Sequence, residues 1–157
     1  PAGNHFSGKI GENPRSLPTN LFPLICRVAS GNISKLVIYG DNWNTIDGSG
    51  VRDYIHVMDL AEGHVKALDY SNKKEKSFLV LNLGTGKGTS VFELINTFER
   101  VNGLTLNYEI GNKRIGDIAE YYADCTKAKE TIGWSAKRSL DDICKDGWKW
   151  QHEYRNR

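Results

Sequence analysis

The chain lacks the sequence features of membrane proteins and of nucleic-acid-binding proteins. No apolar run approaches the roughly 20 residues that span a bilayer. The first 24 residues lack the charged start and apolar middle of a signal peptide. A nucleic-acid-binding surface would show a concentrated basic stripe, but the densest basic run, Lys73, Lys74 and Lys76, is interrupted by Glu75. We therefore expect a cytoplasmic protein that binds neither membrane nor nucleic acid.

Cysteine and histidine are too few and too scattered for a disulfide framework or a metal site. The three cysteines, Cys26, Cys125 and Cys144, are widely spaced and include no Cys-x-x-Cys pair. The four histidines have no metal-ligand spacing. One of them, His64, falls on the predicted apolar face of a helix, where we expect a buried, hydrogen-bonded side chain.

Methionine is almost absent, because Met58 is the only one and the chain begins with Pro1. We therefore expect that the sequence is a piece of a longer protein. Its 157 residues suffice for one domain of ordinary size but hardly for two. The 21 Lys and Arg residues nearly balance the 19 Asp and Glu residues, as in an average soluble domain.

Hydrophobic periodicity predicts helices and strands that alternate along the chain. Apolar residues spaced three and four apart predict a helix over residues 21–29, and Ser90 with Glu93 forms a capping box at the start of another. Further helices are predicted from Asp59, over 126–132 and from Leu140. Predicted strands cover 36–39, 54–57, 78–83 and 106–110, and the third is apolar enough to be covered on both faces. This alternation indicates an α/β fold.

Glycines in the sequence Gly84-x-Gly86-x-Gly88 lie between a predicted strand and a predicted helix, as in a dinucleotide-binding loop. Backbone N–H groups at such a turn can hold phosphate. The fingerprint requires a glycine where this chain has Thr89, however, and a glycine turn also lets a strand and a helix approach closely. We favour the structural interpretation.

A second pattern, Tyr70-x-x-x-Lys74, places a tyrosine and a lysine on one helix face, as in many nicotinamide-dependent reductases. Ser71 and Asn72 predict that the helix ends here, and a charged loop follows. The context therefore argues against a catalytic pair.

Two loops each carry an arginine and an acid, as Arg52-Asp53 and Arg114-x-x-Asp117. A guanidinium group matches phosphate oxygens, and a nearby carboxylate can accept hydrogen bonds from ribose hydroxyls. If the loops converge, they could bind a nucleoside diphosphate. The alternative is that each pair is a structural salt bridge, and composition and spacing do not decide between the two.

The chain as a whole resembles the C-terminal portion of the UDP-glucose 4-epimerase family, within the extended short-chain dehydrogenases/reductases. The resemblance covers essentially the whole chain in order. It rests on the blocks PAGNHFSGKIGENP, TNLFPLICRVASG, LVIYGDNWNTIDGSGVRDYIHVMDLAEGHV, NLGTGKGTSVFE, KRIGDIAEYYAD and DGWKWQ.

The resemblance implies an α/β fold that comprises the C-terminal substrate-binding lobe and the last sheet elements of a Rossmann-type extended reductase. In the family, an N-terminal Rossmann half binds NAD and carries the catalytic Tyr-x-x-x-Lys group. We therefore expect residues 1–157 to be the UDP-sugar-binding portion, without catalytic or NAD-binding residues and inactive alone. The implied reaction of the full-length protein interconverts UDP-glucose and UDP-galactose through a 4-keto intermediate. The implied partners are these substrates, the N-terminal half and a second copy in a homodimer.

The resemblance also implies roles for individual residues. Arg52 and Arg114 match the diphosphate-binding arginines, and Asp117 matches the acid that meets the uridine ribose. Tyr121 matches the position that limits sugar size, so its ring should exclude an N-acetyl group. The remaining matched positions are the substrate-contacting helix start, Asn20 and Leu21, and the strand end along the uracil, Val37, Ile38 and Tyr39.

Two alternatives remain open. One is another NAD-dependent enzyme that acts on nucleotide sugars, such as a dehydratase or a decarboxylating synthase. The other is a non-catalytic fragment that acts at most as a UDP-binding module.

Overall fold

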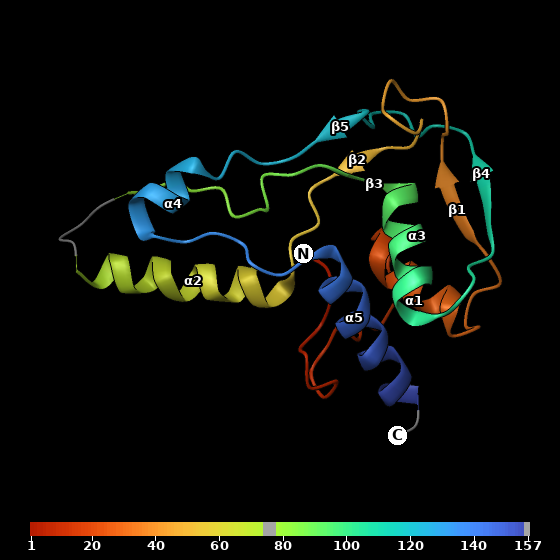
Figure 1. The fold of residues 1–157 in the computed structure, drawn as a ribbon, viewed down its shortest axis with the longest axis horizontal. Helices are drawn as coiled ribbons and strands as arrows, with labels where there is room; N and C mark the ends of the chain where they lie inside the picture. The colour runs from red at the N-terminus through yellow and green to blue at the C-terminus, as the bar shows by residue number, and fades with distance from the viewer. Residues whose placement is uncertain (74–77, 156–157) are drawn as a thin grey trace.

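The computed structural model describes residues 1–73 and 78–155 (Figure 1). Five helices and five short strands make up the regular structure of these residues. In chain order they are α1 (Leu21–Ala29), β1 (Leu36–Tyr39), β2 (Val51–Arg52), α2 (Val57–Asn72), β3 (Thr89–Ser90), α3 (Val91–Asn102), β4 (Tyr108–Gly111), β5 (Glu120–Tyr121), α4 (Thr126–Ile132) and α5 (Leu140–Arg155).

The strands form two small sheets that lie near one end of an elongated molecule (Figure 1). In one sheet, β1 and β4 are parallel and in register from the pair Leu36 and Tyr108 to the pair Tyr39 and Gly111. In the other, β2 lies between β3, which is antiparallel to it, and β5, which is parallel. Each sheet therefore joins segments that are far apart in the sequence.

The main core lies between α1, α3 and α5. Ile25, Leu94, Phe98 and Ile143 are almost completely buried there. The Phe98 ring packs edge-on against Trp148, with ring centroids 6.0 Å apart. This core supports the β1–β4 sheet and fixes the start of α1 beside it.

A second, smaller cluster lies between α2 and α4, at the other end of the molecule (Figure 1). Trp134 is buried there, and its indole N–H donates to the backbone carbonyl of Asp59 at 3.0 Å.

None of the helices within residues 1–73 and 78–155 combines the length and the hydrophobicity of a membrane-spanning helix.

Most helix predictions are confirmed. The bounds of α1 and α4 match the predicted ranges, and α5 begins at Leu140. The predicted cap of α3 is present, because the Ser90 hydroxyl accepts a hydrogen bond from the backbone N–H of Glu93 at 2.9 Å. These elements depend on local signals.

The predicted strand over residues 54–57 is wrong. The paired residues are Val51 and Arg52 instead, and His56 makes only an isolated bridge to Ala2. The helix that was expected from Asp59 begins at Val57, because the His56 ring caps it by accepting from the N–H of Met58. Histidine is not among the preferred N-cap residues, so this start has no local signal in the sequence.

The prediction of a strand over residues 78–83 that is covered on both faces is also wrong. Residues 78–83 have no strand partner within the described part of the chain, and Phe78 and Val80 are 94% and 60% exposed. On the neighbouring helix α2, His64 is exposed rather than buried, and Leu68 is 61% exposed. Leu81 and Leu83 pack against the second cluster, so described residues cover only part of this apolar pattern.

The cap of α2 predicts a pH-dependent stability. His56 is fully buried, its Nδ1 accepts from Met58, and its Nε2 lies 3.3 Å from Asp146. Because Nδ1 accepts, the neutral ring donates from Nε2. Burial lowers the pKa of His56 below its usual 6.5, against the opposing charge of Asp146.

The unfolded chain therefore takes up a proton at a higher pH than the folded chain. The free energy of unfolding should be constant above the unfolded pKa and should fall below pH 6.5, by at most about 1.4 kcal/mol per pH unit. Urea unfolding at a series of pH values will measure this slope. In His56→Asn, which can still cap the helix, the slope should be smaller. An unchanged slope would show that other groups cause the pH dependence.

Candidate functional site

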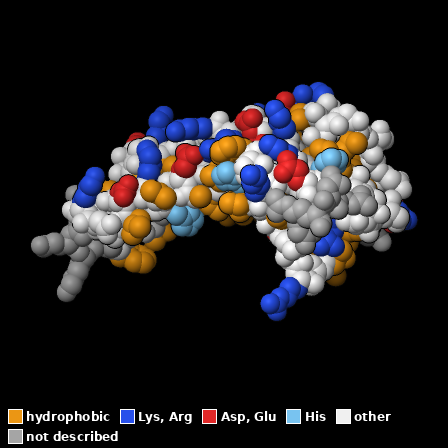
Figure 2. Space-filling view, turned by 90° about the horizontal axis from the view of Figure 1, so that it is seen from below, with side chains coloured by type: hydrophobic (Ala, Val, Ile, Leu, Met, Phe, Trp, Pro, Cys, Tyr) orange, Lys and Arg blue, Asp and Glu red, His pale blue; other side chains and the backbone are white. Residues whose placement is uncertain are grey.

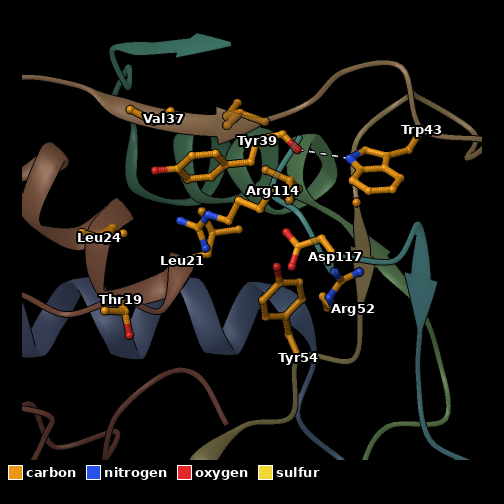
Figure 3. A pocket seen from close by; sticks show the side chains of 13 residues that line it. Thr19, Leu21, Leu24, Val37, Tyr39, Trp43, Arg52, Tyr54, Arg114 and Asp117 are labelled. Carbon is orange, nitrogen blue, oxygen red and sulfur yellow. Dashed lines mark hydrogen bonds between the residues drawn. The ribbon is translucent and has the colours of Figure 1, made fainter. Parts of the chain in front are cut away.

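A cavity gathers residues from several separate segments of the chain (Figure 3). It lies where β1 and β2 end, beside the start of α1 and the loop over residues 112–119. In sheets with parallel strands, ligands bind at such carboxyl ends. The lining residues are Thr19, Leu21, Leu24, Val37, Ile38, Tyr39, Trp43, Gly50, Arg52, Tyr54, Val91, Arg114 and Asp117.

Arg114 lies over an aromatic ring in this cavity. Its guanidinium carbon is 3.6 Å from the centre of the Tyr39 ring. The backbone carbonyl of Tyr39 accepts a hydrogen bond from the Trp43 indole N–H at 3.1 Å (Figure 3). One face of the Tyr39 ring is therefore covered by a cation, and no described residue accepts a hydrogen bond from the guanidinium N–H groups.

Arg52 contributes a second guanidinium group from the end of β2. One of its nitrogens, Nη1, donates to the backbone carbonyl of Val51 at 2.7 Å. Tyr54 lies close by on the same wall (Figure 3). Burial raises the pKa of Tyr54 to about 12, although the charge of Arg52 acts in the opposite direction. At neutral pH its phenol group therefore keeps its proton and can donate a hydrogen bond.

Neither arginine forms the salt bridge that the sequence left open. Within residues 1–73 and 78–155, no carboxylate lies within ion-pair distance of Arg52 or Arg114. Asp117 is joined to Arg114 only through the backbone, where its N–H donates to the Arg114 carbonyl at 3.3 Å. The cavity therefore holds two guanidinium groups that form no ion pair with a described acid.

The structure brings most of the predicted site residues together in this cavity. Asn20 and Tyr121 are the exceptions. Asn20 precedes α1 with extended backbone angles, and its side chain makes no capping hydrogen bond. Tyr121 is 66% exposed on β5 and is paired in register with Arg52. The predicted residues in the lining are Leu21, Val37, Ile38, Tyr39, Arg52, Arg114 and Asp117.

Several lining residues are not among the predicted site residues. Trp43 and Tyr54 are the most informative, because each carries a ring and a hydrogen-bonding group into the cavity wall. Trp43 lies in the loop between β1 and β2, four residues after Tyr39, and Tyr54 lies two residues after Arg52. An aromatic residue in a glycine-rich loop was the available signal.

The glycine turn at residues 84–86 binds the chain's own carboxylate. Asp53 accepts hydrogen bonds from the N–H groups of Thr85 and Gly86 and from the Thr85 hydroxyl, at 2.9, 3.2 and 2.6 Å. A Cβ atom at Gly84 would lie 2.4 Å from Asp53 Oδ2. The turn is therefore structural, and its donors do not fit a dinucleotide phosphate.

The pattern of Tyr70 and Lys74 adds nothing to the cavity. Tyr70 lies in the last turn of α2 and lines a different cavity with His64 and Leu81. Lys74 lies outside the described residues. A catalytic pair has no support from this part of the chain.

Comparison with known proteins identifies similar sequences. A UDP-glucose 4-epimerase of Drosophila melanogaster is 49% identical over 99% of this chain, which corresponds to 45% of that protein. The UDP-glucose 4-epimerase of Bacillus subtilis is also 49% identical, over 96% of this chain and 44% of that protein. The chain thus spans less than half the length of these relatives.

Solved structures agree with the sequence comparison. A UDP-glucose 4-epimerase from Stenotrophomonas maltophila, with bound NAD and formylated UDP-arabinopyranose, matches with a TM-score of 0.95 and 45% identity. The enzyme from Bifidobacterium longum, in complex with NAD+ and UDP, matches with a TM-score of 0.93 and 44% identity. Each match covers 99% of this chain and 46% of the other.

The matched region is the C-terminal part of these extended reductases, so the predicted fold class is confirmed. A family model described as GDP-mannose 4,6 dehydratase also matches residues 2–147. This match includes every segment that lines the cavity. The chain therefore belongs to the GDP-mannose 4,6 dehydratase family, and within it is similar to the C-terminal part of UDP-glucose 4-epimerases.

Proposed function

We propose that this chain supplies the UDP-sugar site of a UDP-glucose 4-epimerase. The complete enzyme would interconvert UDP-glucose and UDP-galactose through a 4-keto intermediate. The observation that carries the proposal is the cavity in which two arginines lie beside an aromatic and aliphatic wall and form no ion pair with any acid that the structure describes. A nucleoside diphosphate offers the matching chemistry, because it joins a charged diphosphate to a flat base.

Each part of the ligand has a counterpart in the wall. Arg52 and Arg114 bind the diphosphate, and Asp117 accepts hydrogen bonds from the ribose hydroxyls. The uracil lies along the end of β1, from Val37 to Tyr39. Leu21 contributes to the apolar wall at the start of α1.

Asn20 and Tyr121 contact the ligand from the edge of the cavity in this proposal. The side chain of Asn20 makes no capping hydrogen bond, so its amide can turn to the ligand. Tyr121 stands next to Arg52 across the β2–β5 pair, which supports a position near the sugar that follows the diphosphate.

NAD belongs to the N-terminal half in this proposal, because the glycine turn of this chain already holds Asp53. When bound there, NAD supplies the hydride transfer of the reaction. This chain's own residues bind and orient the UDP-sugar. The chain alone should therefore convert no UDP-galactose, and detectable conversion by the purified chain would contradict the division of labour.

Exposed apolar side chains support the proposed contact with that N-terminal half. Val65 and Leu68 of α2 and Phe78 and Val80 of the unpaired segment are all exposed. Figure 2 shows hydrophobic side chains along the end of the molecule that contains α2. An unpaired extended segment can take up another strand, and an exposed apolar helix face can be covered by a neighbouring layer.

A homodimer and a cytoplasmic location are part of the same proposal for the complete protein.

Titration of the chain with UDP tests the site directly. We expect amide resonances near Tyr39, Arg52 and Arg114 to shift together in the NMR spectrum, because these residues share one cavity. Residues of the glycine turn, such as Thr85, should not shift and serve as an internal control. If the shifts appear at the turn and not in the cavity, the proposed site is wrong.

Substrate choice provides a further prediction. If Tyr121 limits sugar size, the complete enzyme should prefer UDP-glucose over UDP-N-acetylglucosamine. Replacing Tyr121 by alanine should reduce that preference in kcat/KM by about tenfold, because a cavity for the acetamido group opens. The adjacent Tyr122, which lines a different pocket, provides a matched control as Tyr122→Ala. Equal turnover of both sugars by the unmodified enzyme would contradict the prediction.

A further inference from the structure

Two consecutive cations of the loop after β4 each lie on an aromatic ring, one at the end of β1 and one in the loop that follows it. Lys113 Nζ is 4.3 Å from the centre of the Trp43 ring, and the Arg114 guanidinium is 3.6 Å from that of Tyr39. Lys113 also donates to the backbone carbonyl of Asn42 at 3.0 Å. We call these contacts of Lys113 with Asn42 and Trp43 the loop clasp.

The backbone beneath the loop clasp is closely fitted. Trp43 is held by its hydrogen bond to the Tyr39 carbonyl, and Gly40 donates to the carbonyl of Gly111 at the end of β4. Gly40 has a φ of 88°, and a Cβ atom there would lie 2.6 Å from Lys113 Cγ and 2.9 Å from Trp43 Nε1. The lysine stem and the indole therefore both approach a position that only glycine leaves open.

Arg114, by contrast, has few constraints of its own. Its side chain is exposed, and among the described residues its guanidinium contacts the Tyr39 ring without an ion pair. An arginine side chain held at one surface contact retains much rotamer freedom, and fixing it on binding costs affinity. Lys113, one residue earlier, is attached at two points to the opposite loop.

We infer that Lys113 is a positioning residue, which holds the loop over residues 112–117 against Asn42 and Trp43 and thereby keeps Arg114 over Tyr39 at the cavity. The role rests on the proposed function, since it matters for a ligand whose phosphates meet Arg114. Lys113 itself does not line the cavity. It acts through Arg114 and through the path of the loop.

A measurement without ligand tests the positioning itself. Protons of the Arg114 side chain above the Tyr39 ring should have resonances shifted by the ring current. Lys113→Met keeps an aliphatic stem but removes the cation and the hydrogen bond, so the shift should shrink toward that of an exposed arginine. Lys113→Arg keeps a cation and a donor and should preserve most of it. An unchanged shift in Lys113→Met would overturn the inference, whether or not the chain binds UDP.

Ligand titration then tests the consequence. Calorimetry should show UDP bound about threefold to tenfold more weakly by Lys113→Met, since one exposed cation–π contact and one hydrogen bond are lost. Uridine, which has no phosphate, should bind with unchanged affinity. The matched control is Lys145→Met, which removes an exposed charge from α5 and should leave both affinities unchanged.

A double-mutant cycle separates positioning from direct attraction of the phosphates by the lysine charge. If Lys113 acts through Arg114, Lys113→Met should have little further effect on UDP affinity in an Arg114→Ala background. A full additional loss in that background would overturn the inference. If Arg114→Ala leaves UDP affinity unchanged while Lys113→Met moves the Arg114 resonances, the positioning stands and the proposed diphosphate site fails.

Discussion

Replacing Asp59 by alanine should lower the free energy of unfolding by about 3 kcal/mol or more. Asp59 is fully buried at the start of α2. Its carboxylate accepts hydrogen bonds from the backbone N–H groups of Lys137 and Arg138, at 3.1 and 2.9 Å, and from the Arg138 guanidinium. Without the carboxylate, three donors lose their partner at once, and a partly buried cation is left without its closest counter-charge.

Urea unfolding monitored by tryptophan fluorescence will measure the loss. Trp134 is a suitable probe, because it is buried beside Asp59 and donates to the Asp59 carbonyl. The matched control is Glu62→Ala, since Glu62 bonds to the same guanidinium group but is 41% exposed. We expect that control to cost about 1 kcal/mol or less. Equal losses in both variants would show that the buried network adds nothing beyond a surface ion pair.

The same network illustrates what the sequence could not reveal. The sequence predicts Asp59 at the start of a helix. In the structure, the carboxylate instead binds residues almost 80 positions later in the chain. A capping pattern describes only neighbours in sequence, so it cannot show that a distant backbone segment offers better donors.

Local signals did predict the elements whose ends are fixed by neighbouring residues. Ser90 caps α3, and Gly103 and Gly133 end α3 and α4 in the left-handed conformation that favours glycine. Strands are different, because their hydrogen bonds join distant segments. The apolar residues near Tyr54 predicted a strand, but the available partners, residues 89–90 and 120–121, pair with Val51 and Arg52.

The apolar periodicity of the sequence was a poorer guide to burial than to the positions of helices. Leu68 and Phe78 lie in patterns that are typical of covered faces, and both are exposed. An apolar pattern shows that a face avoids water, but it does not say which surface covers it. Residues of the chain itself cover α3 and α5, whereas no described residue covers this face of α2.

For the candidate site, the resemblance supplied residues that the structure then brought together. Seven of the nine lie in one cavity, although they come from separate loops and strands. The stacking of Arg114 on Tyr39 and the role of Trp43 were not predictable, because they depend on how two loops meet after folding. The acid beside Arg52 in the sequence, Asp53, neither pairs with Arg52 nor lines the cavity, because it binds the glycine turn instead.

Replacing Arg114 by alanine should weaken UDP binding by about tenfold to a hundredfold. A hydrogen bond to a charged group contributes about 1.5 to 3 kcal/mol, and every 1.4 kcal/mol is a factor of ten in affinity. The guanidinium already lies at the cavity wall without an acid partner among the described residues, so binding a diphosphate breaks no ion pair. Calorimetric titration of the chain with UDP will measure the change.

Two variants and a second ligand make the result specific. Arg114→Lys keeps the charge but loses the planar fork, so its affinity should lie between those of the unmodified chain and of Arg114→Ala. Arg100→Ala removes an exposed arginine that pairs with Asp141 on α5, and it should leave UDP affinity unchanged.

Uridine, which has no phosphate, distinguishes a contact of Arg114 with the phosphates from its contact with the Tyr39 ring. If the guanidinium binds phosphate, uridine affinity should change little in Arg114→Ala. If uridine is weakened as much as UDP, Arg114 acts instead by supporting the Tyr39 ring against the base, and the diphosphate assignment is wrong.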